Sequence, residues 1–145
     1  GKMDRVLVDA PCSGTGTLRR HPDLKWRQGA DAVPAMAATQ AAVLRAAARL
    51  LKPGGRLVYA TCSLLAQENE DIAQAFSGDN PDLRPMDAAA VLAQAGAVAD
   101  AQAGAALCSP GAEGAGGAQG PRYLRLWPHR HGTDGFFAAV WEKQA

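Results

Sequence analysis

Two short runs of apolar residues set the pattern of the chain. Residues 5–9 ("RVLVD") and 56–62 ("RLVYATC") are rich in β-branched side chains and carry apolar residues at successive positions. A strand with one solvated face alternates apolar and polar residues, whereas a strand of a parallel sheet is covered on both faces and forms a continuous apolar run. The pattern therefore predicts two parallel strands, both in the middle of a sheet.

A helical period separates the two strands. Over residues 33–51 the apolar side chains recur every three or four positions, which predicts an amphipathic helix. Pro34 suits its first turn, and residues 52–55 ("KPGG") supply a stop. Because a strand, a helix and a parallel strand form a right-handed crossover, we expect the two strands to be neighbours or nearly so. The expected buried face consists of Met36, Val43, Leu44, Ala47, Leu50 and Leu51, with Arg45 and Arg49 opposite.

The rest of the chain predicts two further helices, a loop and a hairpin. Residues 66–76 are acidic and amphipathic and residues 87–96 are rich in alanine, so both segments are expected to be helical. The Ala/Gly-rich stretch 97–120 predicts a flexible loop. Residues 122–129 and 135–143 predict an antiparallel hairpin at a sheet edge. The fold class is therefore α/β, with parallel strands and a terminal antiparallel hairpin.

Composition changes this picture little. With 145 residues the chain has the size of one domain, and its 48% hydrophobic and 20% charged residues are ordinary for a globular protein. The formal net charge of +1 indicates neither disorder nor a strongly basic nucleic-acid binder. Three cysteines are an odd count, and we recognise no leader peptide or long apolar span. We therefore expect reduced thiols in a cytoplasm, without a disulfide framework or a membrane anchor.

Side chains that can do chemistry gather where the two predicted strands stop. In doubly wound sheets, ligands bind beyond the carboxyl ends of the strands. Asp9 and Cys12 occupy that place on the first strand, and Cys62 occupies it on the second. Neighbouring strands lie about 5 Å apart, so two thiols and one carboxylate would come within reach of one small molecule. Each residue also has a plainer interpretation, because a buried cysteine acts as a small hydrophobe and Asp often caps a turn.

Other motifs point less clearly to chemistry. The glycines of residues 14–16 ("GTG") begin a dinucleotide fingerprint, but Arg19 stands where its third glycine belongs. The cysteines and histidines lack the paired C-x-x-C spacing of a zinc site, so no metal is expected, and Cys108 is treated as structural or incidental. The stretch 19–27 ("RRHPDLKWR") surrounds Trp26 with basic side chains. This mixture suits phosphates and base stacking, or else a solvated loop.

Five stretches together indicate a family. In chain order they are "DAPCSGTG", "RRHPDLKWR", "LKPGGRLVYATCS", "ENE" and "HGTDGFFAAVWEK". With them the sequence resembles the Sun (Fmu) type of RNA cytosine-5 methyltransferases, and most of all the bacterial ribosomal RNA enzymes, from Asp4 to Lys143 apart from the Ala/Gly stretch. The resemblance implies a Rossmann-like fold that uses S-adenosylmethionine as cofactor. It also implies methylation of carbon 5 of a cytosine in ribosomal RNA, with the small subunit as the expected source of that RNA.

The resemblance implies roles for three residues. In this family the thiolate of the Thr-Cys motif, here Cys62, adds to carbon 6 of the cytosine, so that carbon 5 can attack the methyl group. The Pro-Cys motif, here Cys12, assists release of the methylated product. Asp9 matches the family acid that lies at the cofactor and the target base, and we expect it to serve both. DNA cytosine-5 methyltransferases attack from a Pro-Cys motif, so "ATCS" beside "APCS" favours RNA as substrate.

The match to the family begins inside its catalytic domain. The glycine-rich cofactor loop and the acid that binds the cofactor ribose are expected to precede residue 1. Residues 1–145 are therefore expected to be a partial methyltransferase catalytic domain, the carboxyl-terminal half of an incomplete fold. We expect this chain alone to bind S-adenosylmethionine weakly, to be inactive, and to self-associate through the open edge of its first strand.

The sequence is also compatible with two other functions. A methyltransferase that modifies an exocyclic amine would use the acid and proline after the first strand, but it has no use for Cys62. A noncatalytic RNA-binding or assembly module would keep the fold without its chemistry. Neither alternative predicts a covalent RNA adduct in a Cys12 variant, and the two-thiol mechanism does.

Overall fold

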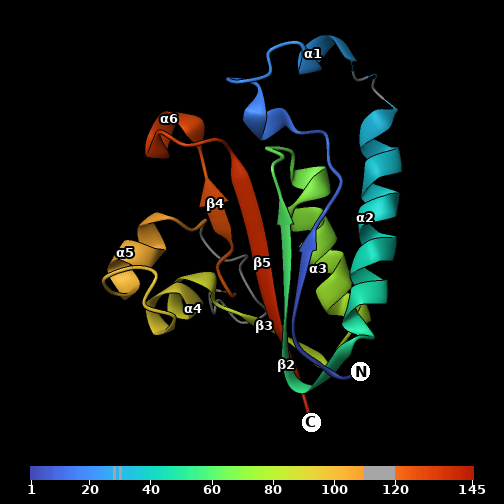
Figure 1. The fold of residues 1–145 in the computed structure, drawn as a ribbon, viewed down its shortest axis with the longest axis vertical. Coiled ribbons are helices and arrows are strands. Elements are labelled where there is room, and N and C mark those ends of the chain that lie inside the picture. The colour runs from blue at the N-terminus through green and yellow to red at the C-terminus, as the bar shows by residue number, and fades with distance from the viewer. Residues whose placement is uncertain (28, 30, 110–119) are drawn as a thin grey trace.

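A five-stranded mixed sheet forms the centre of the molecule (Figure 1). The computed structural model describes residues 1–27, 29, 31–109 and 120–145. The strands are β1 (Met3–Asp9), β2 (Leu51–Thr61), β3 (Leu83–Met86), β4 (Leu124–Leu126) and β5 (Phe136–Lys143). The helices are α1 (Leu24–Arg27), α2 (Ala32–Ala48), α3 (Glu70–Asp79), α4 (Ala88–Gln94), α5 (Ala101–Ala106) and α6 (Pro128–His131), with short 3-10 turns η1 (Thr15–Thr17) and η2 (Ala66–Glu68). The strand order is β1-β2-β5-β3, and β4 also pairs with β5.

The predicted crossover is present. β1 and β2 are parallel neighbours connected by α2, and α2 and α3 lie together on one side of the sheet (Figure 1). Leu44 of α2 and Leu57 of β2 are fully buried. The helix ends at Ala48, before the predicted stop, because Leu51 already belongs to β2 and pairs with β1. Leu50 is consequently outside the helix and half-exposed, contrary to the predicted buried face.

The terminal hairpin forms, but it does not lie at the sheet edge. β4 and β5 are antiparallel, as predicted. β5 also pairs with β2 along one side and with β3 along the other, so it is a central strand. The physical reason is its composition, because Phe137, Ala139 and Trp141 are all buried and the strand is apolar enough to be covered. β4 stops early because Pro128, which has no N–H group to donate, begins α6.

The segment predicted to be a flexible loop contains a helix. Within residues 97–120, α5 begins after Asp100, whose carboxylate accepts a hydrogen bond from the Ala103 N–H at 2.8 Å. Gly104 of α5 lies so close to α4 that an added Cβ would be 2.8 Å from the Ala89 carbonyl oxygen. The cap and this close packing hold residues 101–106 as a helix, although their composition suggested otherwise. Residues 110–119 lie outside the described part of the chain.

The strand β3 was not predicted from the sequence, and it is short. β3 spans four residues and includes Pro85, which argues against a strand when only the sequence is considered. It lies at an end of the strand order, where only one side of it is paired with β5. An edge position tolerates a residue without an N–H donor, which explains how this proline is accommodated.

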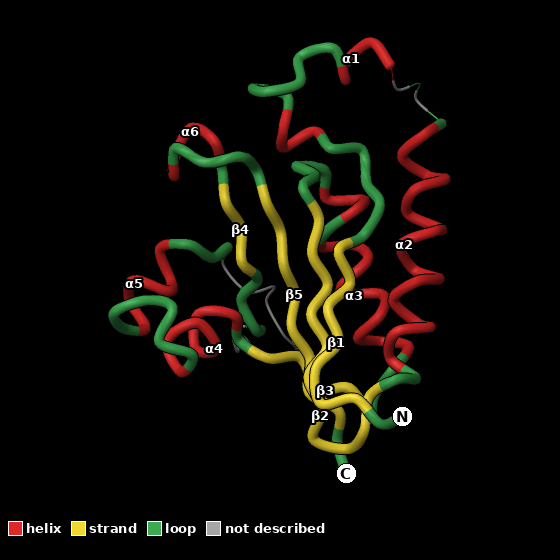
Figure 2. The backbone as a smooth tube through the Cα atoms, in the orientation of Figure 1, coloured by secondary structure: helices red, strands yellow, loops and turns green. Residues whose placement is uncertain are grey.

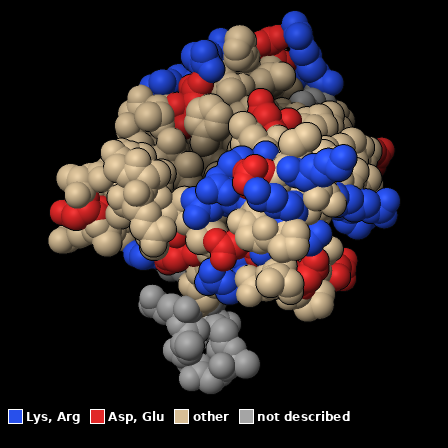
Figure 3. All heavy atoms as spheres, turned by 60° about the horizontal axis from the view of Figure 1, so that its bottom comes forward, with Lys and Arg blue, Asp and Glu red and all other residues tan. Residues whose placement is uncertain are grey.

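Charged side chains of both signs are mixed at the end of the molecule where the two termini lie (Figure 3). Lys52 forms an ion pair with Asp4 at 2.6 Å, and Arg84 forms one with Glu142 at 3.0 Å. Among the described residues, the charges visible at this end are of both signs, whereas a surface that binds a polyanion is predominantly positive. Across the described residues, every helix is too short or too polar to span a membrane.

The outer edge of β1 is open. β1 ends the strand order, which is the open edge expected for this chain alone, and Leu7 and Met3 are 68% and 52% exposed. Together with α2 it lines an apolar groove of about 480 Å³. An unpaired strand edge beside apolar surface is a template for pairing with another chain.

We expect the 145-residue chain to self-associate by pairing two β1 edges, and we expect Leu7→Lys to return it to the monomer. A lysine on an edge strand opposes pairing because two buried ammonium groups would face each other. Sedimentation equilibrium measures the change. Trp26→Ala, which removes an exposed aromatic ring elsewhere, is the control and should leave the association unchanged. A monomeric unsubstituted chain would contradict the expectation.

Candidate active site

The two thiols that were predicted to meet lie side by side. Cys12 belongs to the loop after β1 (residues 10–17, the first cysteine loop), and Cys62 begins the loop after β2 (residues 62–65, the second cysteine loop). Their sulfur atoms are 3.4 Å apart, both side chains are half-buried, and neither forms a disulfide. Figure 2 shows both loops at the same end of the sheet, the end where α1 lies. The parallel pairing of β1 and β2 is what brings the thiols together.

Burial decides the charge of this pair. Removal from water disfavours a thiolate, and it raises the pKa of Cys12 to about 12, with a further upward contribution from the neighbouring Cys62. Because the two sulfur atoms are 3.4 Å apart, a negative charge on either one would oppose a negative charge on the other. At neutral pH Cys12 is therefore a protonated thiol.

Asp9, the third predicted site residue, lies at the end of β1 and is exposed. It lines the apolar groove between β1 and α2, where its neighbours include Val8 and Ala47. The structure thus places the carboxylate at the mouth of a groove on the open side of β1 and the thiols just beyond the strand ends. Two residues, Ala10 and Pro11, separate Asp9 from Cys12 along the chain.

A buried carboxylate joins the two cysteine loops. Each cysteine is followed by a serine, and the hydroxyls of Ser13 and Ser63 both donate hydrogen bonds to Oε2 of Glu68, which is fully buried. The Ser13 hydroxyl is 2.6 Å from Oε2, and the Ser13 backbone N–H donates to Oε1 at 2.8 Å. Gln40 of α2 donates to Oε1 at 3.1 Å. One carboxylate therefore ties both cysteine loops to each other and to α2.

The predicted helix over residues 66–76 is interrupted at Asn69. η2 ends at Glu68, and Asn69 has φ −118° and ψ −95°, which are not helical, before α3 begins. The break directs the Asn69 side chain inward, where it accepts a hydrogen bond from the Thr61 hydroxyl and donates one to the Ser63 carbonyl at 2.8 Å. The interruption therefore places the side chains of Glu68 and Asn69 in contact with Ser63 of the second cysteine loop.

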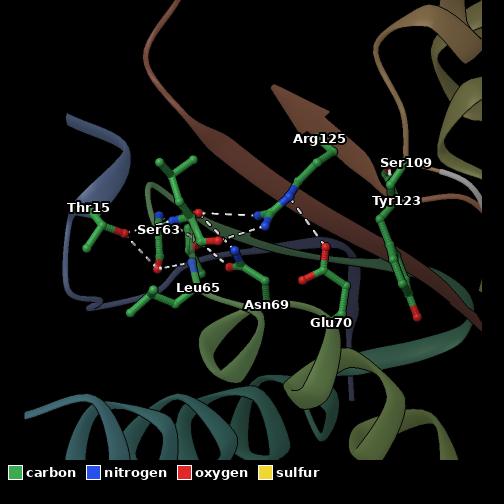
Figure 4. Close-up of polar contacts among 10 residues, drawn as sticks. Thr15, Ser63, Leu65, Asn69, Glu70, Ser109, Tyr123 and Arg125 are labelled. Atoms are coloured by element: carbon green, nitrogen blue, oxygen red, sulfur yellow. Dashed lines mark hydrogen bonds and ion pairs between the residues drawn. The ribbon is translucent and has the colours of Figure 1, made fainter. Parts of the chain in front are cut away.

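A buried guanidinium holds the second cysteine loop from the side of the hairpin (Figure 4). Arg125 of β4 is 4% exposed and donates to the carbonyls of Leu64 at 2.9 Å and Ser63 at 3.4 Å. It forms an ion pair with Glu70 at 3.4 Å, and its Cζ atom lies 4.4 Å from the ring centre of Trp127. A buried cation needs such compensation. The guanidinium thereby connects the hairpin to the loop that carries one of the thiols.

A third loop closes on the two cysteine loops through glycines. The Gly16 N–H donates to the Cys62 carbonyl at 2.8 Å, and the Gly16 carbonyl accepts from the Gly135 N–H at 2.8 Å. The Thr15 hydroxyl accepts a hydrogen bond from the Leu64 N–H at 2.8 Å. Gly16 has no room for a side chain, because an added Cβ would lie 2.7 Å from the Cys62 carbonyl oxygen and 2.8 Å from the Gly135 carbonyl carbon.

We expect Gly16→Ala to lower the free energy of unfolding by about 2–3 kcal/mol, because the added methyl group must push backbone atoms apart. Chemical denaturation of the two chains measures the difference. Gly78→Ala in α3 is the matched control, since its Cβ meets open space and alanine favours a helix more than glycine does. It should leave stability unchanged or raise it, and an equal loss in both variants would contradict the packing argument.

The basic segment predicted near Trp26 is partly engaged within the protein. Trp26 is 81% exposed on α1, and the Lys25 ammonium lies 4.8 Å from its ring centre. Arg19 and Arg20 instead form ion pairs with Asp134, which is largely buried. Beside α1, a pocket of about 240 Å³ adjoins both cysteine loops, and its lining includes Ser13, Lys25 and Leu65.

Comparison with known proteins places this geometry in a family. The sequence model described as 16S rRNA methyltransferase RsmB/F matches residues 1–142. The chain belongs to this family. A ribosomal RNA small subunit methyltransferase B of Vibrio cholerae is 53% identical over 83 residues, which are 57% of this chain and 19% of that protein. One from Salmonella newport is 52% identical over 81 residues, 56% of this chain and 19% of that protein.

Solved structures agree with the RsmB/F assignment. The crystal structure of PH0851 is 38% identical with a TM-score of 0.72, and the match covers 97% of this chain and 26% of that one. NSun6 from Pyrococcus horikoshii, solved with SFG, is 28% identical with a TM-score of 0.66, covering 99% of this chain and 31% of that one. The family and the partial methyltransferase fold predicted from the sequence are thereby confirmed. The chain spans about a fifth of the length of the curated relatives that it matches.

Three buried residues of the candidate site were not identified from the sequence. Glu68 and Asn69 were assigned to an ordinary acidic helix, and Arg125 to a strand of the hairpin. The "ENE" stretch was a family motif without an assigned role, and the serines after both cysteines were not assigned a role either. The available signal was the repeated Cys-Ser pair, because a buried serine hydroxyl needs a hydrogen-bond partner.

Proposed function

We propose that the protein carrying this chain methylates carbon 5 of a cytosine in small subunit ribosomal RNA through a covalent bond between Cys62 and the base. The observation that carries the proposal is the 3.4 Å separation of the two sulfur atoms at the carboxyl ends of β1 and β2. The RsmB/F family and relatives that are ribosomal RNA small subunit methyltransferases support the substrate class.

The cofactor in this proposal is S-adenosylmethionine. One structural neighbour was solved with SFG, an analogue of this compound. The exposed Asp9 carboxylate at the apolar groove beside β1 fits part of such a ligand, because a carboxylate can bind a cationic amine while the groove accepts apolar surface. When bound, the cofactor supplies an electrophilic methyl group. In our proposal Asp9 holds it and also faces the target base.

The two thiols have different proposed tasks. Cys62, as thiolate, forms a bond to carbon 6 of the cytosine, and the ring electrons move to carbon 5, which then bonds to the methyl group. The proton on carbon 5 must then leave, and the bond between Cys62 and carbon 6 must break to restore the aromatic ring and the thiolate. Burial raises the pKa of Cys12, which supports Cys62 as the nucleophile.

Cys12 is proposed to assist the release step. While Cys62 is bonded to carbon it carries no charge, so the repulsion that helps to keep Cys12 protonated is absent. Cys12 can then give its proton to solvent and, as a thiolate, accept the proton of carbon 5, while the electrons of that C–H bond restore the ring and Cys62 leaves as a thiolate. With only one sulfur atom beside the ring, that atom would have to attack carbon 6 and also accept the proton of carbon 5.

The RNA is proposed to approach over α1. The exposed Trp26 ring with Lys25 beside it offers stacking and a positive charge at the end of the sheet where the thiols lie. A target cytosine inside structured RNA must leave its stack to reach the two sulfur atoms. We place this reaction in the cytoplasm, where the three free thiols stay reduced.

The test is direct detection of the product. The gene product that carries this chain is incubated with S-adenosylmethionine and unmodified small subunit ribosomal RNA, which is then digested to nucleosides. We expect 5-methylcytidine in the chromatogram. Methylation of the exocyclic amine of cytosine would support the alternative methyltransferase, and RNA binding without any methylation would support a noncatalytic module.

A further inference from the structure

Each thiol of the site is followed by a serine that contacts one common carboxylate. The hydroxyls of Ser13 and Ser63 both donate to Oε2 of Glu68, although 50 residues separate the two serines. The serine oxygens themselves are 3.3 Å apart. In the two Cys-Ser pairs the sulfur of one contacts the sulfur of the other, and the serine hydroxyl of one contacts the serine hydroxyl of the other. Glu68 bridges the two hydroxyls.

The hydrogen bonds between Glu68 and the two serines are buried. Glu68, Ser13 and Ser63 are each at most 2% exposed, so water cannot replace a lost partner. A carboxylate that accepts from two hydroxyls, one backbone N–H and the Gln40 amide has all its contacts from donors, as an ionised carboxylate requires. Hydrogen bonds to a charged acceptor are stronger and shorter than neutral ones.

Position explains why both sulfur atoms depend on this residue. Cys12 and Ser13 are adjacent in the chain, as are Cys62 and Ser63, so a shift of either serine moves the neighbouring sulfur. The backbone of Glu68 is itself held, because the Tyr59 hydroxyl donates to its carbonyl at 2.6 Å. Gln40, which also donates to the Pro11 carbonyl at 2.8 Å, ties the start of the first cysteine loop to the same cluster.

We propose that Glu68 is a positioning residue that holds the Cys12 and Cys62 sulfur atoms against each other. Its side chain is fully buried, so it acts through the two serines that it contacts. The inference rests on the proposed function for its biological purpose, because the attack and release steps each need one sulfur at the same ring. The placement of the sulfur atoms can nevertheless be measured without RNA, cofactor or turnover.

The measurement is the tendency of the two thiols to form a disulfide with each other. The 145-residue chain, with Cys108→Ser so that only two thiols remain, is equilibrated with reduced and oxidised glutathione. One oxidised glutathione takes two electrons and two protons from Cys12 and Cys62, and leaves as two reduced glutathione molecules. Thiol counting and a mass loss of two hydrogen atoms give the equilibrium constant, which rises when the sulfur atoms are held together.

We expect Glu68→Ala to lower this equilibrium constant roughly ten-fold, because both serines lose a buried partner and the loops separate. Glu68→Gln should restore it to within about three-fold, because the amide oxygen still accepts from the Ser13 N–H and serine hydroxyls can turn to accept from the amide nitrogen. Ser63→Ala, which removes a single donor, should give a smaller fall and serves if Glu68→Ala does not fold.

Leu83→Ala in β3 is the control for lost stability, because it empties a buried site far from the two loops in the sheet order. It should leave the equilibrium constant unchanged. The inference is wrong if folded Glu68→Ala and Ser63→Ala keep the constant of the parent chain, or if Glu68→Gln loses as much as Glu68→Ala. Absence of 5-methylcytidine in the methylation test would overturn the proposed function and leave this measurement unaffected.

Discussion

We expect replacement of Cys62 by Ala to lower methyl transfer to unmodified small subunit ribosomal RNA by roughly 10⁴-fold or more, because in the proposed mechanism no bond to carbon 6 then forms and carbon 5 stays unreactive. The assay measures transfer of a labelled methyl group from S-adenosylmethionine by the gene product that carries this chain. The loss should appear at saturating RNA concentrations, since Cys62 is proposed to act after the base has entered the site.

The matched control is Cys108→Ala. Cys108 is a half-buried free thiol that follows α5, where its backbone pairs with β4, so it resembles Cys62 in exposure but not in position. Its replacement should leave methyl transfer within about two-fold of the unsubstituted protein. If Cys62→Ala kept more than about a tenth of the activity, covalent catalysis through this residue would be excluded. The exocyclic-amine alternative, which has no use for the thiol, would then be favoured.

We expect replacement of Cys12 by Ala to trap the proposed covalent intermediate. The attacking sulfur remains, but its neighbour at 3.4 Å no longer accepts the proton of carbon 5, so the bond between Cys62 and carbon 6 persists. We expect at least a ten-fold rise in the protein–RNA complex that survives denaturing gel electrophoresis, accompanied by a loss of turnover. The trapped complex should require S-adenosylmethionine if methylation precedes release.

A double variant sharpens this result. Cys12→Ala combined with Cys62→Ala should form no covalent complex, because the attacking sulfur is then missing. Cys12→Ser retains a small hydroxyl of similar shape, and it should also trap the complex, because a hydroxyl gives up its proton far less readily than a thiol. Rapid turnover by Cys12→Ala without any trapped complex would refute the division of labour between the two thiols.

Local patterns in the sequence were sufficient for the elements near the site. The continuous apolar runs gave β1 and β2, and the helical period between them gave α2, so the parallel pairing and the meeting of Cys12 with Cys62 could be anticipated. The residues at which helices and strands begin and end were predicted less accurately than the elements themselves. Leu51, for instance, has the spacing of a helix but pairs with β1 as the first residue of β2.

Long-range packing explains where the predictions failed. The sequence of β5 does not say whether it ends the sheet or lies inside it, because that depends on which strands flank it. Residues 97–120 appeared flexible by composition, yet a cap at Asp100 and the fit of Gly104 against α4 order α5. In both cases the deciding contacts come from elements that are distant in sequence or depend on the shape of a neighbour.

By itself the sequence determined the α/β class, the family, and the two cysteines at the ends of neighbouring strands, because each of these depends on short-range period or on contiguous motifs. Only the tertiary structure decided which residues hold those cysteines. Glu68 meets Ser13 across 55 positions and Arg125 meets Ser63 across 62. Such contacts follow from how the sheet and its loops close in space, and a buried polar side chain finds its partners only after the chain has folded.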